Sequence, residues 1–151
     1  MMTITVADVL NDSLHESGWG KFRIYVFRDN DFVLYVGKTE HNVIDRLSEH
    51  LGLTYRSESH IGRLVKENVP EAHRWQIDLL TLDDCTSFVK RHFPTNKAID
   101  VRLAEQAVIL EFAPPLNHES NPHPRLLPRR YLTHKEARVK AVMEKVINAK
   151  K

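Results

Sequence analysis

The sequence predicts an α+β fold: a small, mostly antiparallel three-stranded sheet flanked by helices, with a C-terminal helical extension. Two observations carry this prediction. Two short runs of β-branched and aromatic residues, 22–27 and 32–36, surround a polar turn, which is the pattern of a β-hairpin. Segments with apolar residues at helical spacing come before and after this pair. The resulting order, α-β-β-α-α-β-α-α, is that of an α+β domain.

A third strand and several helices complete the predicted domain. Residues 74–80 alternate between polar and apolar side chains, as expected of a strand. Helices are predicted where apolar residues recur every three or four positions, at 6–15, 42–51, 59–67, 83–92 and 98–112. The last of these has the strongest apolar stripe and ends at a Pro-Pro pair, because proline disfavours helix in the residue before it.

The composition changes near residue 120. Residues 118–130 contain three prolines among arginines and histidines, the pattern of an irregular linker. A terminal amphipathic helix follows, with apolar residues at Val139, Val142, Met143, Val146 and Ile147. We therefore expect a core domain at 1–120 and a basic extension, made of a Pro-containing linker and a terminal helix, at 121–151.

The overall composition is that of one globular domain. The chain has 151 residues, of which 42% are hydrophobic and 28% charged, and this excludes a disordered or fibrous protein. No apolar run is long enough to cross a membrane, and the first residues lack the pattern of a secretory signal. Cys85 is the only cysteine, which excludes a disulfide framework and a Cys-rich zinc site. We expect a cytoplasmic protein with no membrane partner.

The charge of the chain is unevenly distributed. Lys and Arg number 22 and Asp and Glu 20, so the formal net charge of +2 alone gives little reason to expect nucleic acid. Residues 121–151, however, hold nine basic and two acidic side chains, a net +7, which leaves −5 on residues 1–120. Such a basic tail suits a phosphate backbone, with strong salt dependence. A solvated basic helix is the alternative.

Residues able to carry chemistry lie on the hairpin and on two predicted helices. Tyr25 and Tyr35 are ten residues apart, one on each hairpin strand, and Arg46 and His50 are four apart on one helix face. Glu105 lies on the apolar helix 98–112. Each has an ordinary structural explanation when taken singly: strand packing for the tyrosines, a solvated face for Arg46 and His50, and interaction with the helix dipole for Glu105.

The tripeptide Gly37-Lys38-Thr39 resembles the end of a phosphate-binding P-loop. That motif needs a glycine five residues before Gly37, where Phe32 stands within a predicted strand. We therefore exclude a P-loop.

Taken together, these residues resemble the GIY-YIG nuclease family. Arg23-Ile24-Tyr25 stands for the first tripeptide of that family and Tyr35-Val36-Gly37 for the second. Arg46 falls at the position of the family's helix arginine. Glu105 is followed after twelve residues by Asn117, past a proline stop, as in the family's closing motif.

The resemblance runs from about residue 22 to residue 117, although 53–97 carry no family motif. It departs from the family in three places. Arg23 replaces the first glycine, nine residues separate the tripeptides, which is slightly short, and Arg46 comes one residue later than expected. None of these departures removes a functional side chain.

The resemblance implies the GIY-YIG fold and a divalent-metal-dependent endonuclease with catalytic residues Tyr25, Tyr35, Arg46, His50 and Glu105. Glu105 would hold Mg²⁺ or Mn²⁺, since a single carboxylate with several waters suits Mg²⁺. Tyr25 is the implied general base. Because free tyrosine has a pKa of about 10, it needs help from His50 as a second base or from Lys38, which would favour the phenolate.

The other candidates would bind or position the substrate. Arg46 offers a planar cation for phosphate oxygens, and Tyr35 would position the water or a phosphate oxygen. Asn117 would orient neighbouring groups or contact the backbone. The expected substrate-binding residues are Lys38, Asn117, Arg129 and Arg130.

We expect a nucleic-acid partner, DNA before RNA, and hydrolysis of one phosphodiester per active site. A dimer in which each site cuts one strand is compatible with the size of the chain. The alternatives are a catalytically weak GIY-YIG-fold nucleic-acid-binding module and a regulatory or protein-interaction module whose terminal helix docks a partner.

Overall fold

The computed structural model describes residues 1–11, 18–53, 59–96 and 98–149. The strands are β1 (Met2–Thr5), β2 (Ile24–Asp29), β3 (Phe32–Lys38) and β4 (Gln76–Leu80). The helices are α1 (Val6–Leu10), α2 (Val43–His50), α3 (His60–Glu67), α4 (Thr86–His92), α5 (Val101–Phe112) and α6 (Thr133–Ala149). Short 3₁₀ helices lie at η1 (Trp19–Lys21), η2 (Glu71–Arg74), η3 (Asp83–Cys85) and η4 (Arg129–Tyr131).

The predicted α+β class is confirmed, but the predicted strand count of three is wrong. The sheet has four strands in the order β1-β4-β2-β3, and all neighbours are antiparallel. The additional strand, β1, pairs with β4 along its whole length, with Met2 opposite Leu79 and Thr5 opposite Gln76. The four residues of β1 alternate between apolar and polar side chains, but so short a run does not indicate its partner, and this strand was not predicted from the sequence.

The predicted hairpin is confirmed as β2 and β3. Asn30 has a φ of 52° at its turn, a left-handed conformation that asparagine tolerates well. The pairing places Tyr25 opposite Gly37 and Phe27 opposite Tyr35. Residues paired across two strands share one face of the sheet, so both tyrosines of the hairpin lie on the same face.

The predicted helices are present with shifted ends. The helix expected at 6–15 is α1, and residues 12–17 lie outside the described part of the chain. Residues 42–51 and 59–67 become α2 and α3, because Asn42 and Ser59 act as N-caps. The helix expected at 98–112 begins later, at Val101, as α5. Its N-cap is Asp100, whose side chain accepts a hydrogen bond from the backbone N–H of Leu103 at 2.7 Å.

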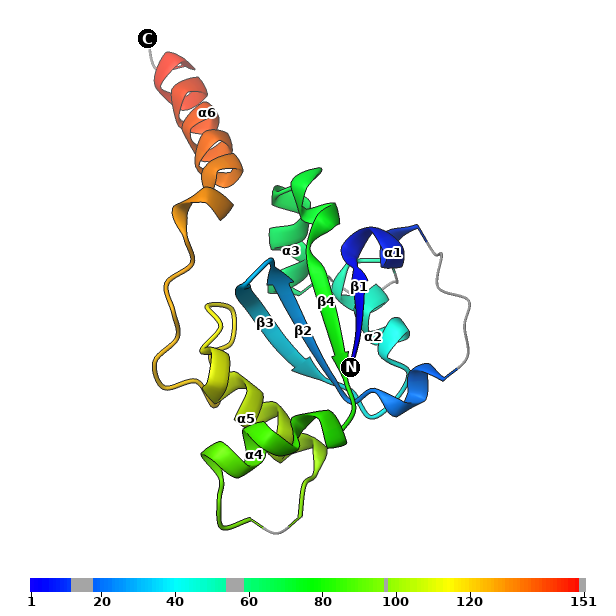
Figure 1. Ribbon diagram of the computed structural model, residues 1–151. Helices are drawn as coiled ribbons and strands as arrows, with labels where there is room; N and C mark the ends of the chain where they lie inside the picture. The colour runs from blue at the N-terminus through cyan, green and yellow to red at the C-terminus, as the bar shows by residue number, and fades with distance from the viewer. Residues whose placement is uncertain (12–17, 54–58, 97, 150–151) are drawn as a thin grey trace.

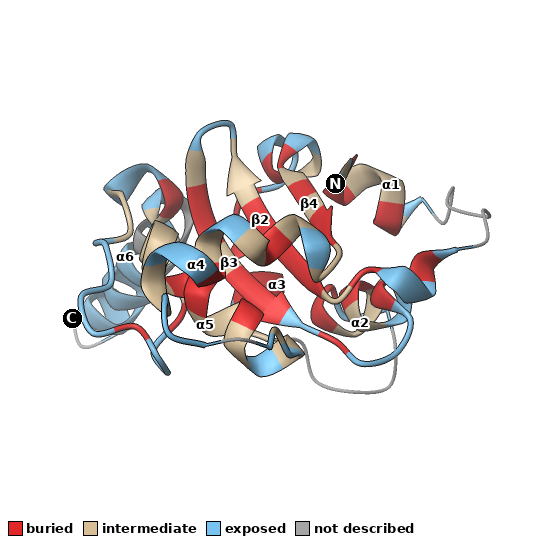
Figure 2. Cartoon of the chain, turned by 60° about the horizontal axis from the view of Figure 1, so that its bottom comes forward, coloured by how far each residue is buried: buried red, intermediate tan, exposed pale blue. Residues whose placement is uncertain are grey.

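Helices cover both faces of the sheet (Figure 1). α1, α2 and α3 pack on the face that carries Tyr25, Phe27 and Leu34, and form the larger core. α5 packs on the opposite face against Ile24 and Val36. The central strands are accordingly buried along most of their length, whereas the outer surfaces of the helices are exposed (Figure 2).

The chain after α5 runs along the free edge of β3. Ala113 ends α5 in the left-handed conformation, with a φ of 45°. The backbone N–H of Leu116 then donates to the carbonyl of Leu34, at 3.2 Å. This contact brings the residues after α5 beside the β3 strand that carries Tyr35.

The first part of the C-terminal extension packs on the core. Tyr131 is 3% exposed, stacks on Phe32 with ring centroids 6.1 Å apart, and donates to Asp29 at 2.7 Å. Its carbonyl accepts a hydrogen bond from Asn68 at 3.0 Å. Packing therefore continues past the expected boundary at residue 120 as far as η4, whereas α6 projects away from the rest of the fold (Figure 1). None of the described helices is long and apolar enough to span a membrane.

Candidate active site

The centre of the candidate site is a close approach between Tyr25 and Gly37. A β-carbon added at Gly37 would overlap the hydroxyl end of the Tyr25 ring. The two residues are paired across β2 and β3. Gly37, the glycine of the second tripeptide, therefore leaves the space that the ring of Tyr25, the tyrosine of the first tripeptide, occupies.

Tyr25 is hydrogen-bonded to His50 of α2. Tyr25 Oη lies 2.6 Å from His50 Nε2, and both side chains are buried, at 1% and 3% exposure. The His50 ring also packs edge-on against Tyr25 and Tyr35, with centroids 5.4 and 5.5 Å away. α2 therefore brings the predicted base and its predicted helper together.

Burial keeps both members of this pair neutral. It raises the pKa of Tyr25 far above the ordinary value, and the nearby Tyr35 adds to this, while Arg46 acts in the opposite direction. Burial also lowers the pKa of His50 from 6.5 to about 4, and the positive charge of Arg46 lowers it further. At neutral pH the pair is consequently a phenol and an uncharged imidazole.

An open cavity of about 400 Å³ lies in front of this pair. Six of the predicted site residues line it: Tyr25, Tyr35, Lys38, Arg46, Glu105 and Asn117. They come from β2, β3, α2, α5 and the segment after α5, so residues up to 92 positions apart in sequence meet at one place. His50 lies behind Tyr25, outside the cavity wall.

Glu105 is the half-buried carboxylate of this cavity. Burial raises its pKa, the positive charge of Lys38 lowers it, and the charge of Glu119 raises it again. Within the described residues, the influences on its pKa are burial and nearby charges. A half-buried carboxylate in such a polar cavity fits a hydrated divalent cation.

Other metal ligands are sparse around Glu105. The described part of the chain holds no group of three or more His, Cys, Asp or Glu side chains placed to bind a metal ion. The single carboxylate of Glu105 is a donor that fits Mg²⁺ or Mn²⁺ keeping most of its waters.

Arg46 is held at the rim of the cavity by an acidic neighbour. Its Nη1 lies 2.9 Å from Glu49 Oε2, one turn further along α2, and 43% of the Arg46 side chain is exposed. The guanidinium is therefore accessible from solvent and is paired with the Glu49 carboxylate.

Asn117 contacts the backbone of β3. Its side-chain oxygen accepts from the N–H of Val36 at 2.9 Å, and its side-chain nitrogen donates to the carbonyl of Val36 at 2.8 Å. Of the two roles expected for Asn117, the structure shows the backbone contact. Asn121, also buried, donates to the carbonyls of Pro114 and Asn117 and holds this turn closed.

Arg129 and Arg130 do not join this cavity. Both belong to η4, and Arg130 lies over the ring of Tyr131 and 3.8 Å from Asp29. Asp29 ends β2, whereas Tyr25 lies near its beginning. Contact of these arginines with the substrate remains a prediction for a surface at the other end of the hairpin.

Sequence reasoning missed two residues near the site. Ser59, the N-cap of α3, lies 2.6 Å from His50 Nδ1. Glu119 lines the cavity beside the exposed His118. The sequence marked Ser59 only as the start of a helix, and Glu119 lies within an irregular segment where no periodicity indicates direction.

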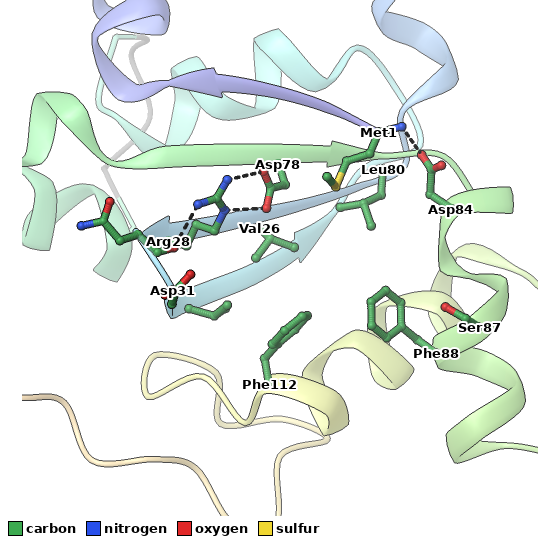
Figure 3. Close-up of a pocket in the computed structure, with 12 residues that line it drawn as sticks. Met1, Val26, Arg28, Asp31, Asp78, Leu80, Asp84, Ser87, Phe88 and Phe112 are labelled. Carbon is green, nitrogen blue, oxygen red and sulfur yellow. Dashed lines mark hydrogen bonds and ion pairs between the residues drawn. The ribbon is translucent and has the colours of Figure 1, made fainter.

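A larger cavity of about 560 Å³ lies elsewhere on the sheet (Figure 3). Phe88 and Phe112 line its apolar part. Its principal charged groups are already paired, since Arg28 binds both carboxylate oxygens of Asp78 at 2.7 and 3.1 Å. The predicted site residues do not line this cavity, and we do not assign the chemistry to it.

Comparisons with models of known protein families, with curated proteins and with solved structures found no match to this chain. The geometry of the cavity is therefore the basis of the functional proposal.

Proposed function

We propose that this protein is a divalent-metal-dependent endonuclease of the GIY-YIG type that hydrolyses phosphodiester bonds in DNA. The observation that carries the proposal is the single cavity lined by Tyr25, Arg46 and Glu105, with His50 hydrogen-bonded behind Tyr25. These are the residue types that phosphodiester hydrolysis needs: a route for a proton, a cation for the phosphate and a ligand for a metal ion.

Glu105 would hold the metal ion, with waters completing its coordination. The bound Mg²⁺ or Mn²⁺ would act as a Lewis acid that stabilises the departing 3′-oxygen. Lys38 lines the same cavity and lowers the pKa of Glu105, so it favours the charged carboxylate that such a cation requires.

Tyr25 and His50 would move the proton of the attacking water. A phenol with a raised pKa is a poor source of free phenolate, so Tyr25 cannot act alone. In the proposed step Tyr25 Oη takes a proton from the water while its own proton passes to His50 Nε2, 2.6 Å away. The water O–H bond and the original Tyr25 O–H bond break, and a new Tyr25 O–H bond and a His50 Nε2–H bond form. The resulting hydroxide would attack phosphorus as the bond from phosphorus to the 3′-oxygen breaks.

Arg46 and Tyr35 would position the phosphate. The exposed guanidinium of Arg46 would bind two phosphate oxygens in place of Glu49, and its fixed charge balances the negative charge that develops in the transition state. Tyr35, 6.4 Å from Tyr25 between ring centroids, would direct its hydroxyl to the water or to a phosphate oxygen.

Two features support nucleic acid as the substrate. The cavity is open to solvent and combines Lys38 with Arg46, which suits a chain of phosphates passing across the rim. The chain from residue 121 onward has a net charge of +7. DNA is the proposed substrate, and the assay below distinguishes duplex, single-stranded, flap and branched forms.

The deciding experiment is a cleavage assay with Mg²⁺ or Mn²⁺ on single-stranded, duplex, flap and branched DNA and on RNA. Wild-type protein should cut at least one DNA substrate, and Glu105→Ala and Tyr25→Phe should abolish cutting. Glu111→Gln is the matched control, because Glu111 is on the same helix but pairs with Arg91 and His92 away from the cavity. Binding without cleavage under every condition would identify a nucleic-acid-binding module instead.

A further inference from the structure

His50 makes a second contact through Nδ1, the ring nitrogen that takes no part in the proposed proton transfer. Its Nδ1 lies 2.6 Å from the hydroxyl oxygen of Ser59, which comes from a different helix as the N-cap of α3. The same oxygen accepts a hydrogen bond from the backbone N–H of Gly62 at 3.4 Å. The imidazole therefore lies between two hydroxyl groups, Tyr25 on one side and Ser59 on the other.

The direction of these hydrogen bonds follows from the needs of Tyr25. A neutral imidazole carries one N–H and one acceptor nitrogen. The buried Tyr25 hydroxyl needs an acceptor for its proton, and of the two described side chains that form hydrogen bonds with it, Arg46 has only donors, whereas His50 can accept. His50 Nε2, at 2.6 Å, is then the acceptor, so the imidazole proton is on Nδ1 and points at Ser59.

We propose that Ser59 is a positioning residue that accepts the Nδ1–H of His50 and so keeps Nε2 free to receive the proton of Tyr25. The hydrogen-bonding part of this proposal stands on the contacts of Ser59 and His50 alone. Its consequence for catalysis rests on the proposed nuclease function. In this arrangement the base, His50, is oriented by a third group, the hydroxyl of Ser59 at the N-cap of the neighbouring helix α3.

Loss of the Ser59 hydroxyl would remove this hydrogen-bond acceptor from the Nδ1–H of the buried His50. The imidazole would then populate the other tautomer, in which Nε2–H points at Tyr25 and blocks the proton transfer. We expect a kcat about 10-fold lower with KM unchanged, because proton transfer is impaired and substrate contacts are not.

Three substitutions separate this role from helix capping. Ser59→Gly removes the hydroxyl while glycine remains an acceptable N-cap. Ser59→Thr and Ser59→Asp retain both a cap and an oxygen that accepts the Nδ1–H. Ser48→Ala is the matched control. Ser48 lies on α2 and is half-buried like Ser59, but its hydroxyl donates to the carbonyl of Ile44 at 2.9 Å rather than to His50.

The direct test is nitrogen NMR of the full chain labelled with ¹⁵N-histidine, in the absence of substrate. The nine histidines are resolved by recording His50→Gln, which removes the His50 signals. Wild type, Ser59→Thr and Ser48→Ala should show His50 with its proton on Nδ1, and Ser59→Gly should show a mixture of tautomers. A wild-type proton on Nε2, or an unchanged tautomer in Ser59→Gly, would overturn the proposal.

Cleavage kinetics on the best DNA substrate provide the second readout. Ser59→Gly should lower kcat about 10-fold, and Ser59→Thr and Ser59→Asp should restore it to within about threefold of wild type. Equal loss in all three variants would contradict the role of Ser59 as the acceptor of the His50 Nδ1–H, because Thr and Asp retain an accepting oxygen. If wild type cuts no substrate, the nuclease proposal fails while the NMR result still decides the hydrogen bond.

Discussion

The phenol ring of Tyr25 lies across the α-carbon of Gly37, its partner on the neighbouring strand, so closely that no β-carbon fits between them. This relationship joins the two tripeptide motifs into one structural unit. The glycine determines where the ring lies, and the ring position determines that its hydroxyl meets His50 at 2.6 Å. The unit can be tested without knowledge of the substrate.

Substitution of Gly37 by alanine should displace Tyr25. The new methyl group would meet a ring confined within the core, which costs about 1–3 kcal/mol in the free energy of unfolding. Cleavage should fall on the order of 100-fold as Tyr25 leaves His50. Gly20→Ala is the control, because a β-carbon at Gly20 meets no atom within 4 Å. Equal urea-unfolding midpoints and rates for the two variants would contradict this account.

The buried His50 predicts a stability that falls on acidification. Its pKa is about 4 in the folded chain and 6.5 ordinarily, so between these values the unfolded chain binds more protons. Above about pH 6.5 the neutral imidazole leaves the free energy of unfolding undiminished, and this free energy falls as the pH is lowered towards 4. The difference between the two pKa values corresponds to about 3 kcal/mol in the free energy of unfolding.

Urea unfolding of wild type and His50→Gln between pH 7.5 and 4 checks this prediction. Carboxylates titrate in both proteins, so the difference between the two curves isolates His50. The wild type should lose more stability than the variant across the window. Parallel curves would show that His50 is not held neutral by burial.

Release of Arg46 from Glu49 should strengthen phosphate binding. The pair joins two partly exposed side chains at 2.9 Å, and such pairs contribute about 0–1 kcal/mol. Glu49→Gln removes the competing anion, so DNA affinity measured by fluorescence anisotropy should rise about two- to fivefold. The control Glu111→Gln, which releases Arg91 on α4, should leave the DNA affinity unchanged. Weaker binding by Glu49→Gln would instead show that Glu49 orients Arg46.

Truncation at two positions separates the basic helix from the core. Removal of residues 133–151 deletes α6 and leaves Tyr131 packed, so the chain should remain folded with weaker DNA binding and a flatter salt dependence. Removal of residues 122–151 also deletes the buried Tyr131 and should cost about 3–5 kcal/mol in stability. An unchanged salt slope in the shorter truncation would exclude α6 from DNA contact.

Local structure was largely predictable from the sequence. The hairpin follows from two β-rich runs around a polar turn, and α2 and α5 follow from apolar spacing, whereas their first residues were set by the caps Asn42 and Asp100 in the structure. Strand β1 was not predictable, because its four residues gain their structure by pairing with a strand more than 70 positions later. Ser59 likewise was predicted only as the start of a helix, because its contact with His50 depends on how α2 and α3 lie relative to each other.

The sequence by itself determined which residue types are present and where the hairpin strands and most helices form, because these depend on periodicities of two and 3.6 residues and on caps within a few positions. Only the tertiary structure decided which of them meet. The Tyr25–His50 contact spans 25 positions and the Asn117–Val36 contact 81, distances over which local periodicity carries no information. Packing of helices on the sheet closes those distances, and it also decided that Asn117 binds backbone while Arg129 and Arg130 lie outside the cavity.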